Sequence, residues 1–134
     1  MRLLLDTHIV LWAVTNDRRL SQRAAQWIKN VDNEVYYSLI SVWEVAIKHQ
    51  SKPEIITLSD EEFVAYAEQT GFQCLALKKT HIALLKTLAP KKTVKEHHDP
   101  FDRMLICQAK AEKMLLMTHD HLLDGYEESC VLTV

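Results

Sequence analysis

Residues 97–120, with the sequence HHDPFDRMLICQAKAEKMLLMTHD, contain the clearest signals of secondary structure in the chain. Asp99 is a good N-cap, and Pro100 suits the first position of a helix because its missing N–H needs no partner there. The short apolar segment Leu115–Met117 is typical of a buried parallel strand. The stretch therefore predicts a helix followed by a strand, with Asp102 in the first helical turn and Asp120 just beyond the strand.

The rest of the chain repeats this alternation of strand and helix. Further strands are expected over residues 2–5, 34–39, 72–77 and 130–134. Further helices are expected over 7–14, 21–30, 41–50, 58–68 and 80–88, with a basic loop over 91–98 and a turn or short helix over 121–128. Strands that alternate with helices predict an α/β fold, in which a parallel sheet is covered on both faces.

The composition predicts a single domain, residues 1–134, without a membrane segment. Apolar residues make up 48% of the chain and charged residues 25%, which is ordinary for a globular protein. No apolar run approaches the roughly 20 residues that a membrane helix needs. The chain has three cysteines, far apart, which indicates reduced thiols and a cytoplasmic location.

The net charge of −2 is unevenly distributed. Residues 71–113 carry nine Lys and Arg against four Asp and Glu, whereas the remainder carries seven against fourteen. A basic flank beside acidic strand ends suits a protein that grips phosphates with one surface and holds a metal with another. Ordinary solvated lysines explain the same pattern, and charge alone favours that simpler interpretation.

Four acids are expected at one edge of the sheet. Asp6 follows the first strand, Glu44 lies in the helix after the second, and Asp102 and Asp120 bracket the last helix–strand unit. Strand C-termini and helix N-termini share one edge in a right-handed parallel topology, and ligands bind at that edge. Clustered carboxylates repel one another unless a cation lies among them, and ligands of this type suit Mg²⁺ or Mn²⁺.

Helix capping is the alternative explanation for each acid taken alone. The spacing Ser41-x-x-Glu44 matches a capping box, and Asp99-x-x-Asp102 resembles one. Asp6 and the acid at residue 120 each precede a predicted helix and suit simple N-caps. Capping does not explain why acids recur at this edge, so both explanations stay open at this point.

Three motifs carry a resemblance to a known family: LLDTH over residues 4–8, S-x-x-S-x-WE over 38–44, and HDPFDRMLI over 98–106 with T-x-D over 118–120. Their order and spacing resemble those of PIN-domain proteins, in particular the VapC-type toxins of bacterial toxin–antitoxin pairs, over nearly the whole chain. The resemblance implies a three-layer α/β/α fold with a central parallel sheet of about five strands. It also implies an endoribonuclease that depends on Mg²⁺ or Mn²⁺, a cognate antitoxin, and a homodimer.

The resemblance assigns roles to individual residues. It implies a catalytic, metal-binding set of four acids: Asp6, Glu44, Asp102 and Asp120. Thr118, Asp99 and Thr7 are expected to support that set, and Ser41 is expected to cap a helix. Candidates for contacts with RNA phosphates are Arg103, Lys78, Lys79, Lys91 and Lys92. A metal-activated water is expected to attack the scissile phosphorus of single-stranded RNA and to leave 5′-phosphate and 3′-hydroxyl ends.

Two other functions compete with this hypothesis. An Asp-based phosphatase or a receiver domain also places an acid after the first strand, but a phosphatase of that kind has Asp-x-Asp, and residue 8 here is His. A receiver has a Lys near its last strand, and residues 114–134 contain none. The second rival is a non-catalytic, PIN-like protein-binding module.

Three tryptophans, Trp12, Trp27 and Trp43, occupy apolar helical positions, where core packing is expected.

Overall fold

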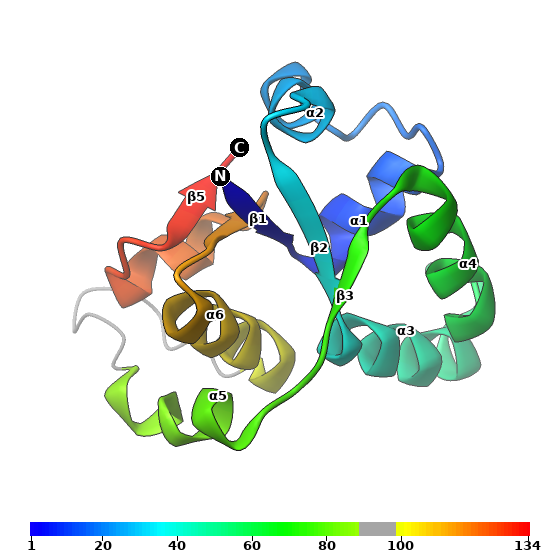
Figure 1. Cartoon of the computed structure of the whole chain (residues 1–134). Helices are drawn as coiled ribbons and strands as arrows, with labels where there is room; N and C mark the ends of the chain where they lie inside the picture. Colours follow the sequence, from blue (N-terminus) through cyan, green and yellow to red (C-terminus); the bar gives the residue numbers. More distant parts are fainter. Residues whose placement is uncertain (89–98) are drawn as a thin grey trace.

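The computed structural model describes residues 1–88 and 99–134, and its centre is a parallel sheet with helices on both faces (Figure 1). The strand order is β3-β2-β1-β4-β5, and every pair of neighbours is parallel. The five strands are β1 (Arg2–Leu5), β2 (Glu34–Ser38), β3 (Gln73–Leu75), β4 (Leu115–Thr118) and β5 (Val131–Thr133). The predicted three-layer α/β/α class is confirmed.

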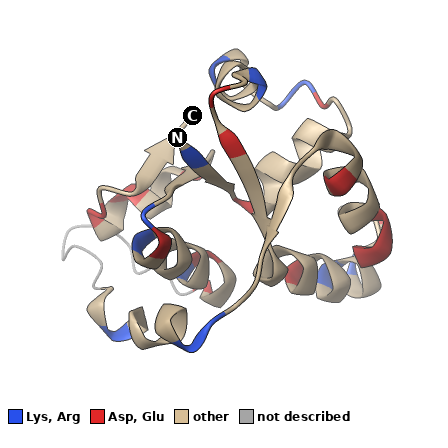
Figure 2. Cartoon of the chain, viewed as in Figure 1, with Lys and Arg blue, Asp and Glu red and all other residues tan. Residues whose placement is uncertain are grey.

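Helices connect the strands, and the described ranges contain both α-helices and short 3₁₀ segments. They are α1 (Thr7–Val14), α2 (Gln22–Lys29), α3 (Leu39–Ser51), α4 (Asp60–Thr70), α5 (Lys79–Ala83), η1 (Leu85–Thr87), α6 (Pro100–Glu112) and η2 (His121–Tyr126). In Figure 2 the acidic residues of α4 and the basic residues around α5 lie on different parts of the surface. No helix in the described ranges is both long and apolar enough to cross a membrane.

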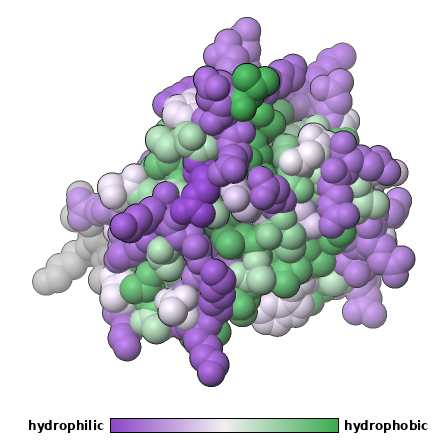
Figure 3. Space-filling model, viewed as in Figure 1, coloured by the Kyte–Doolittle hydropathy of each residue, from purple (hydrophilic) through white to green (hydrophobic). Residues whose placement is uncertain are grey.

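The central strand β1 supplies both layers of the core because its side chains alternate between the two faces of the sheet. Leu3 and Leu5 belong to one apolar cluster and Leu4 to the other, and all three are fully buried. The first cluster contains residues of α1, α2 and α4, whereas the second contains residues of α6 and η2. On the face drawn in Figure 3, apolar side chains gather over the β3 edge of the sheet.

Local signals in the sequence set several helix ends. The Asp99 carboxylate accepts hydrogen bonds from the backbone N–H groups of Phe101 and Asp102 at 2.9 and 3.1 Å, so it caps α6 as predicted. Ser59 and Glu62 form a capping box at the start of α4. Gly71, with φ of +95°, ends that helix in the left-handed region, where a glycine is favoured.

Several helix bounds differ from the sequence-based expectation by one or two residues, and two of the differences bear on the site or on the topology. The helix α3 begins at Leu39 rather than at Ser41, because Ser38, the last residue of β2, accepts a hydrogen bond from the Ile40 N–H and is the N-cap. Ser41 therefore does not cap the helix. The expected helix over 80–88 divides into α5 and the 3₁₀ segment η1. The expected basic loop over 91–98 lies outside the described residues.

Candidate active site

Asp6 lies at the junction of β1 and α1, near the middle of the candidate site. Its carboxylate accepts a hydrogen bond from the Ile9 N–H at 3.1 Å, so it caps α1, and a second from the Thr118 hydroxyl. The residue is 6% exposed. Burial raises the pKa of Asp6, although the hydrogen bonds from Thr118 and Ile9 oppose that shift.

Glu44 reaches the same edge of the sheet from α3. The side chain is buried, accepts a hydrogen bond from Thr7 Oγ1 at 2.6 Å, and forms an ion pair with Lys48 one helical turn further on. A second hydrogen bond joins Thr7 Oγ1 and Ser41 Oγ over 2.9 Å. The capping-box explanation for Glu44 is wrong, because α3 begins earlier and Ser38 is its cap.

Asp120 follows β4 and caps η2 through a hydrogen bond from the Leu122 N–H of 2.9 Å. Its own backbone N–H donates to Thr118 Oγ1 over 3.0 Å. The Thr118 hydroxyl therefore links the Asp6 carboxylate to the backbone of Asp120. Capping is thus correct for Asp6 and Asp120. It does not exclude a second role, because a carboxylate oxygen that accepts one hydrogen bond keeps another lone pair.

Asp102 is affected both by burial and by the charges of neighbouring acids. It is the third residue of α6, in the first turn after the cap Asp99. Burial, followed by the charges of Asp99, Asp6, Glu44 and Asp120, raises the pKa of Asp102 to about 8. The fold therefore brings the other three predicted acids, and Asp99, within electrostatic reach of Asp102.

The chemistry of this set suits a hard divalent cation. All four acids offer carboxylate oxygens, and their mutual repulsion would be relieved by a positive charge between them. Within residues 1–88 and 99–134, no three His, Cys, Asp or Glu side chains form a preformed metal cage. Hydrogen bonds and an ion pair instead hold Asp6 and Glu44 in the arrangement described.

The family model of the PIN domain matches residues 3–128 of the chain. The chain belongs to the PIN-domain family. The resemblance drawn from the DPFDR segment and the flanking acids is thereby confirmed. No curated protein matches the chain in sequence.

Solved structures share the fold of this PIN domain. The VapBC2 complex of Rickettsia felis, bound to a promoter DNA fragment, includes a chain with 14% identity and a TM-score of 0.66, and the match covers 100% of this chain and 98% of that one. FitAcB from Neisseria gonorrhoeae gives 17% identity and a TM-score of 0.62, with coverage of 98% and 96%. VapBC-1 from nontypeable Haemophilus influenzae gives 17% identity and 0.56, with coverage of 95% and 91%. At identities this low, the structural matches establish a common fold and nothing further.

Lys48 is a residue of this PIN domain that sequence reasoning missed. Partial burial opposes its charge, but the hydrogen bond and charge of Glu44, with the charges of Asp99 and Asp102, raise the pKa of Lys48. Its Nζ also lies 5.9 Å from the centre of the Phe101 ring. Lys48 follows Glu44 by four residues, a spacing that favours an ion pair on one helix face. The sequence therefore did contain a signal for this pair.

Among the described residues, the two lysines that were predicted to bind phosphates do not lie beside the acids. Lys78 lies 3.2 Å from Glu112, the last residue of α6, which is about 15 Å along the helix from Asp102. Lys79 begins α5 and is exposed. Arg103 is half-buried and follows Asp102 directly. Lys91 and Lys92 lie outside the described residues.

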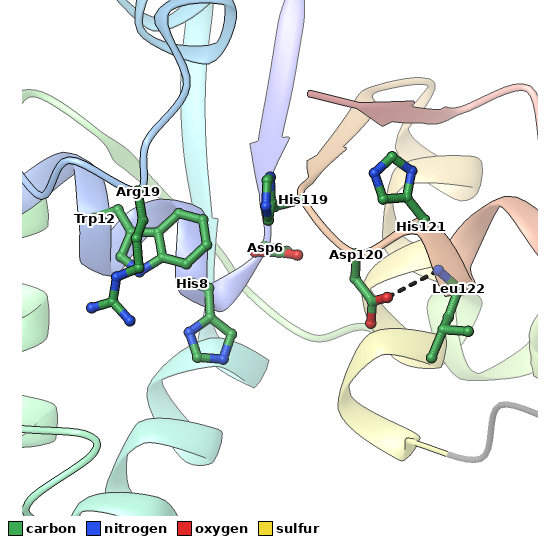
Figure 4. A pocket seen from close by; sticks show the side chains of 8 residues that line it. All are labelled: Asp6, His8, Trp12, Arg19, His119, Asp120, His121 and Leu122. Carbon is green, nitrogen blue, oxygen red and sulfur yellow. Dashed lines mark hydrogen bonds between the residues drawn. The ribbon is translucent and has the colours of Figure 1, made fainter.

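A pocket of about 510 Å³ adjoins the acids of the PIN domain (Figure 4). Asp6 and Asp120 contribute to its wall, and the rest of the lining is His8, Trp12, Arg19, His119, His121 and Leu122. Trp12 is half-buried and Trp43 is 58% exposed, so core packing alone does not account for these two tryptophans. A helical period identifies a helix face but not the surface that it meets, which is why the sequence did not reveal the pocket.

Proposed function

We propose that this PIN domain is an endoribonuclease that depends on Mg²⁺ or Mn²⁺ and acts as the toxin of a toxin–antitoxin pair. The observation that carries the proposal is the group of four acids at one edge of the sheet. Burial, followed by the charges of Asp99, Asp6, Glu44 and Asp120, raises the pKa of Asp102 to about 8. A cation that lies between crowded carboxylates stabilises their ionised form. Family membership supports the same conclusion, because the family resemblance implies a nuclease.

The four acids Asp6, Glu44, Asp102 and Asp120 would hold the cation. When bound, the cation supplies charge neutralisation at a phosphate oxygen and a more acidic water. Thr118 and Thr7 orient the carboxylates of Asp6 and Glu44 by donating hydrogen bonds to them. Asp99 holds the first turn of α6, and so positions Asp102. Arg103 and the lysines 78, 79, 91 and 92 are proposed to contact phosphates further along the RNA.

A protein partner is part of the proposal. The solved structures with this fold are VapBC and FitAB proteins, which supports a cognate antitoxin as the partner. The exposed face of α3 carries Leu39, Trp43 and Ile47, spaced four residues apart, and these are 45%, 58% and 43% exposed. Contiguous exposed apolar side chains of this kind favour protein contacts. A homodimer in the cytoplasm, with the whole chain as one domain, completes the proposal.

RNA cleavage by purified protein tests the proposed activity. Wild type is expected to cleave total RNA or tRNA with Mg²⁺ or Mn²⁺, to lose activity in EDTA, and to leave 5′-phosphate and 3′-hydroxyl ends. Asp102→Asn is expected to abolish cleavage. Asp32→Asn makes the same chemical change in the exposed turn before β2, at the opposite edge of the sheet, and should cleave like wild type. Cyclic phosphate ends, or equal cleavage by Asp102→Asn, would contradict the mechanism.

A further inference from the structure

The pocket beside the acids is lined by flat, unsaturated groups. The rings of Trp12 and His119 meet edge to face, with centroids 5.3 Å apart and an interplanar angle of 74°. The His8 ring lies 5.8 Å from Trp12, and the guanidinium carbon of Arg19 lies 5.4 Å from the centre of the Trp12 ring. Aromatic rings and a guanidinium plane are the groups that proteins use to stack nucleobases.

Neighbouring residues hold the side chains that line this pocket in place. Arg19 is anchored by Asp17, whose carboxylate lies 2.8 Å from the guanidinium. His119 Nδ1 shares a hydrogen bond of 2.9 Å with the Val134 carbonyl. Trp12 packs partly against the core and also lines the pocket, so its ring is held on the core side while part of it borders the cavity. A ring held in this way loses little conformational freedom when a ligand stacks on it.

The pocket is continuous with the candidate active site. Asp6 and Asp120 belong to its wall, and Figure 4 shows Asp6 and His119 between the Trp12 side and the Asp120 side. When one phosphate of an RNA strand lies at the acids, the next base of that RNA is within reach of this pocket and its planar side chains. The volume of about 510 Å³ falls within the range of roughly 300–1,000 Å³ that is usual for small-ligand sites.

We propose that this pocket is a nucleobase subsite, in which one base of single-stranded RNA stacks on Trp12 beside Arg19 while the adjacent phosphate lies at the acids. The inference rests on the proposed ribonuclease function. A peptide side chain is the other possible occupant. The planar lining favours the base, because a base offers a flat π-system to the rings of Trp12, His8 and His119. The subsite places a single nucleotide next to the bond that is cut.

Binding of short RNA, measured without added metal, tests the subsite independently of cleavage. The probes are octamers of adenylate and of uridylate, and an octamer of the same ribose-phosphate backbone without bases. Trp12→Ala is expected to raise the Kd of the base-bearing octamers by about tenfold and to leave that of the base-free chain unchanged, in line with the cost of removing a stacking ring. Trp12→Phe keeps a ring and should restore most of the affinity.

A pair of neighbouring arginines provides a matched test that does not depend on the fold of the Trp12 variant. Arg19 and Arg18 are both exposed, but only Arg19 lines the pocket. Arg19→Ala is expected to weaken binding of the base-bearing octamers by at least about threefold more than Arg18→Ala does. Equal effects of the two substitutions would overturn the subsite.

The outcomes separate the subsite from the activity. Two results would overturn the subsite and leave the ribonuclease intact. One is that wild type cleaves RNA and Trp12→Ala cleaves it with an unchanged KM. The other is that base-bearing and base-free octamers bind with equal Kd. Base-dependent binding through Trp12 without any cleavage would support the subsite and remove the proposed activity. If Trp12→Ala leaves the octamer Kd unchanged and weakens binding of an arginine-containing octapeptide, the pocket is a protein-docking site and the proposal is wrong.

Discussion

Asp102 lies among four other carboxylates, and its pKa of about 8 leaves it protonated at neutral pH in the metal-free protein. In the unfolded chain the same carboxyl ionises near pH 4. Between these values the folded state holds a proton that the unfolded state has lost. The contribution of this group to the free energy of unfolding is therefore largest below about pH 4. It falls as the pH rises and is lost above about pH 8.

The first prediction at the residue scale concerns this titration. In EDTA, the free energy of unfolding of wild type should fall relative to that of Asp102→Asn between pH 5 and pH 8, by roughly 1 kcal/mol or more. Urea unfolding at each pH measures the difference. Asp32→Asn provides the control and should follow wild type. Parallel curves for wild type and Asp102→Asn would show that the Asp102 carboxyl ionises normally.

The second residue-scale prediction concerns Lys48, the cation that accompanies Glu44 in the metal-free protein. Lys48→Met leaves the buried Glu44 carboxylate without its ion pair and should lower the free energy of unfolding in EDTA by about 1–3 kcal/mol. Mg²⁺ should restore part of this loss, since it provides another cation. Lys52→Met, an exposed lysine just after α3, should change little. An equal loss with and without Mg²⁺ would mean that Lys48 acts only on the fold.

At the scale of the element, the N-terminus of α6 combines a cap and a charge in one residue, Asp99. Asp99→Ala removes both and should cost about 1 kcal/mol of stability, whereas Asp99→Asn keeps the cap and removes the charge. Cleavage should fall more in the alanine variant, because the first turn that carries Asp102 loosens. Thermal unfolding and RNA cleavage, measured together, check this prediction.

A matched control for this prediction is the capping box of another helix. Ser59 caps α4, which carries none of the four acids. Ser59→Ala should cost a similar free energy of about 1 kcal/mol but leave cleavage unchanged. If Ser59→Ala and Asp99→Ala reduce cleavage equally, the loss comes from general destabilisation and not from the position of Asp102.

At the scale of the whole molecule, metal binding should be linked to folding, because the site draws residues from β1, α3, α6 and the end of β4. Mg²⁺ is expected to raise the Tm of wild type, and more at pH 8 than at pH 6, since the metal competes with the proton on Asp102. Asp6→Asn should abolish most of this effect. A Tm that does not respond to Mg²⁺ or Mn²⁺ at pH 8 would argue against the metal site.

Much of the architecture was predictable because it depends on local signals and on topology. The caps Asp99 and Ser59, the terminator Gly71 and the apolar strands each follow from the chemistry of neighbouring residues. Parallel topology alone brings strand ends and helix starts to one edge, so the four acids were expected there without any strand pairing being known. The start of α3 was missed because Ser38 and Ser41 are equally good caps, and only the length of β2 decides between them.

Local patterns in the sequence were enough to predict the fold class, the order of the elements and the edge at which the acids lie. Which side chains meet at that edge depends on how the layers pack. Thr7 and Thr118 reach Glu44 and Asp6 across 37 and 112 residues. Trp12, which was expected in the core, packs partly against it and also borders a pocket. The physical reason is that periodicity and capping act within a few residues, whereas hydrogen bonds between distant segments depend on how the layers pack.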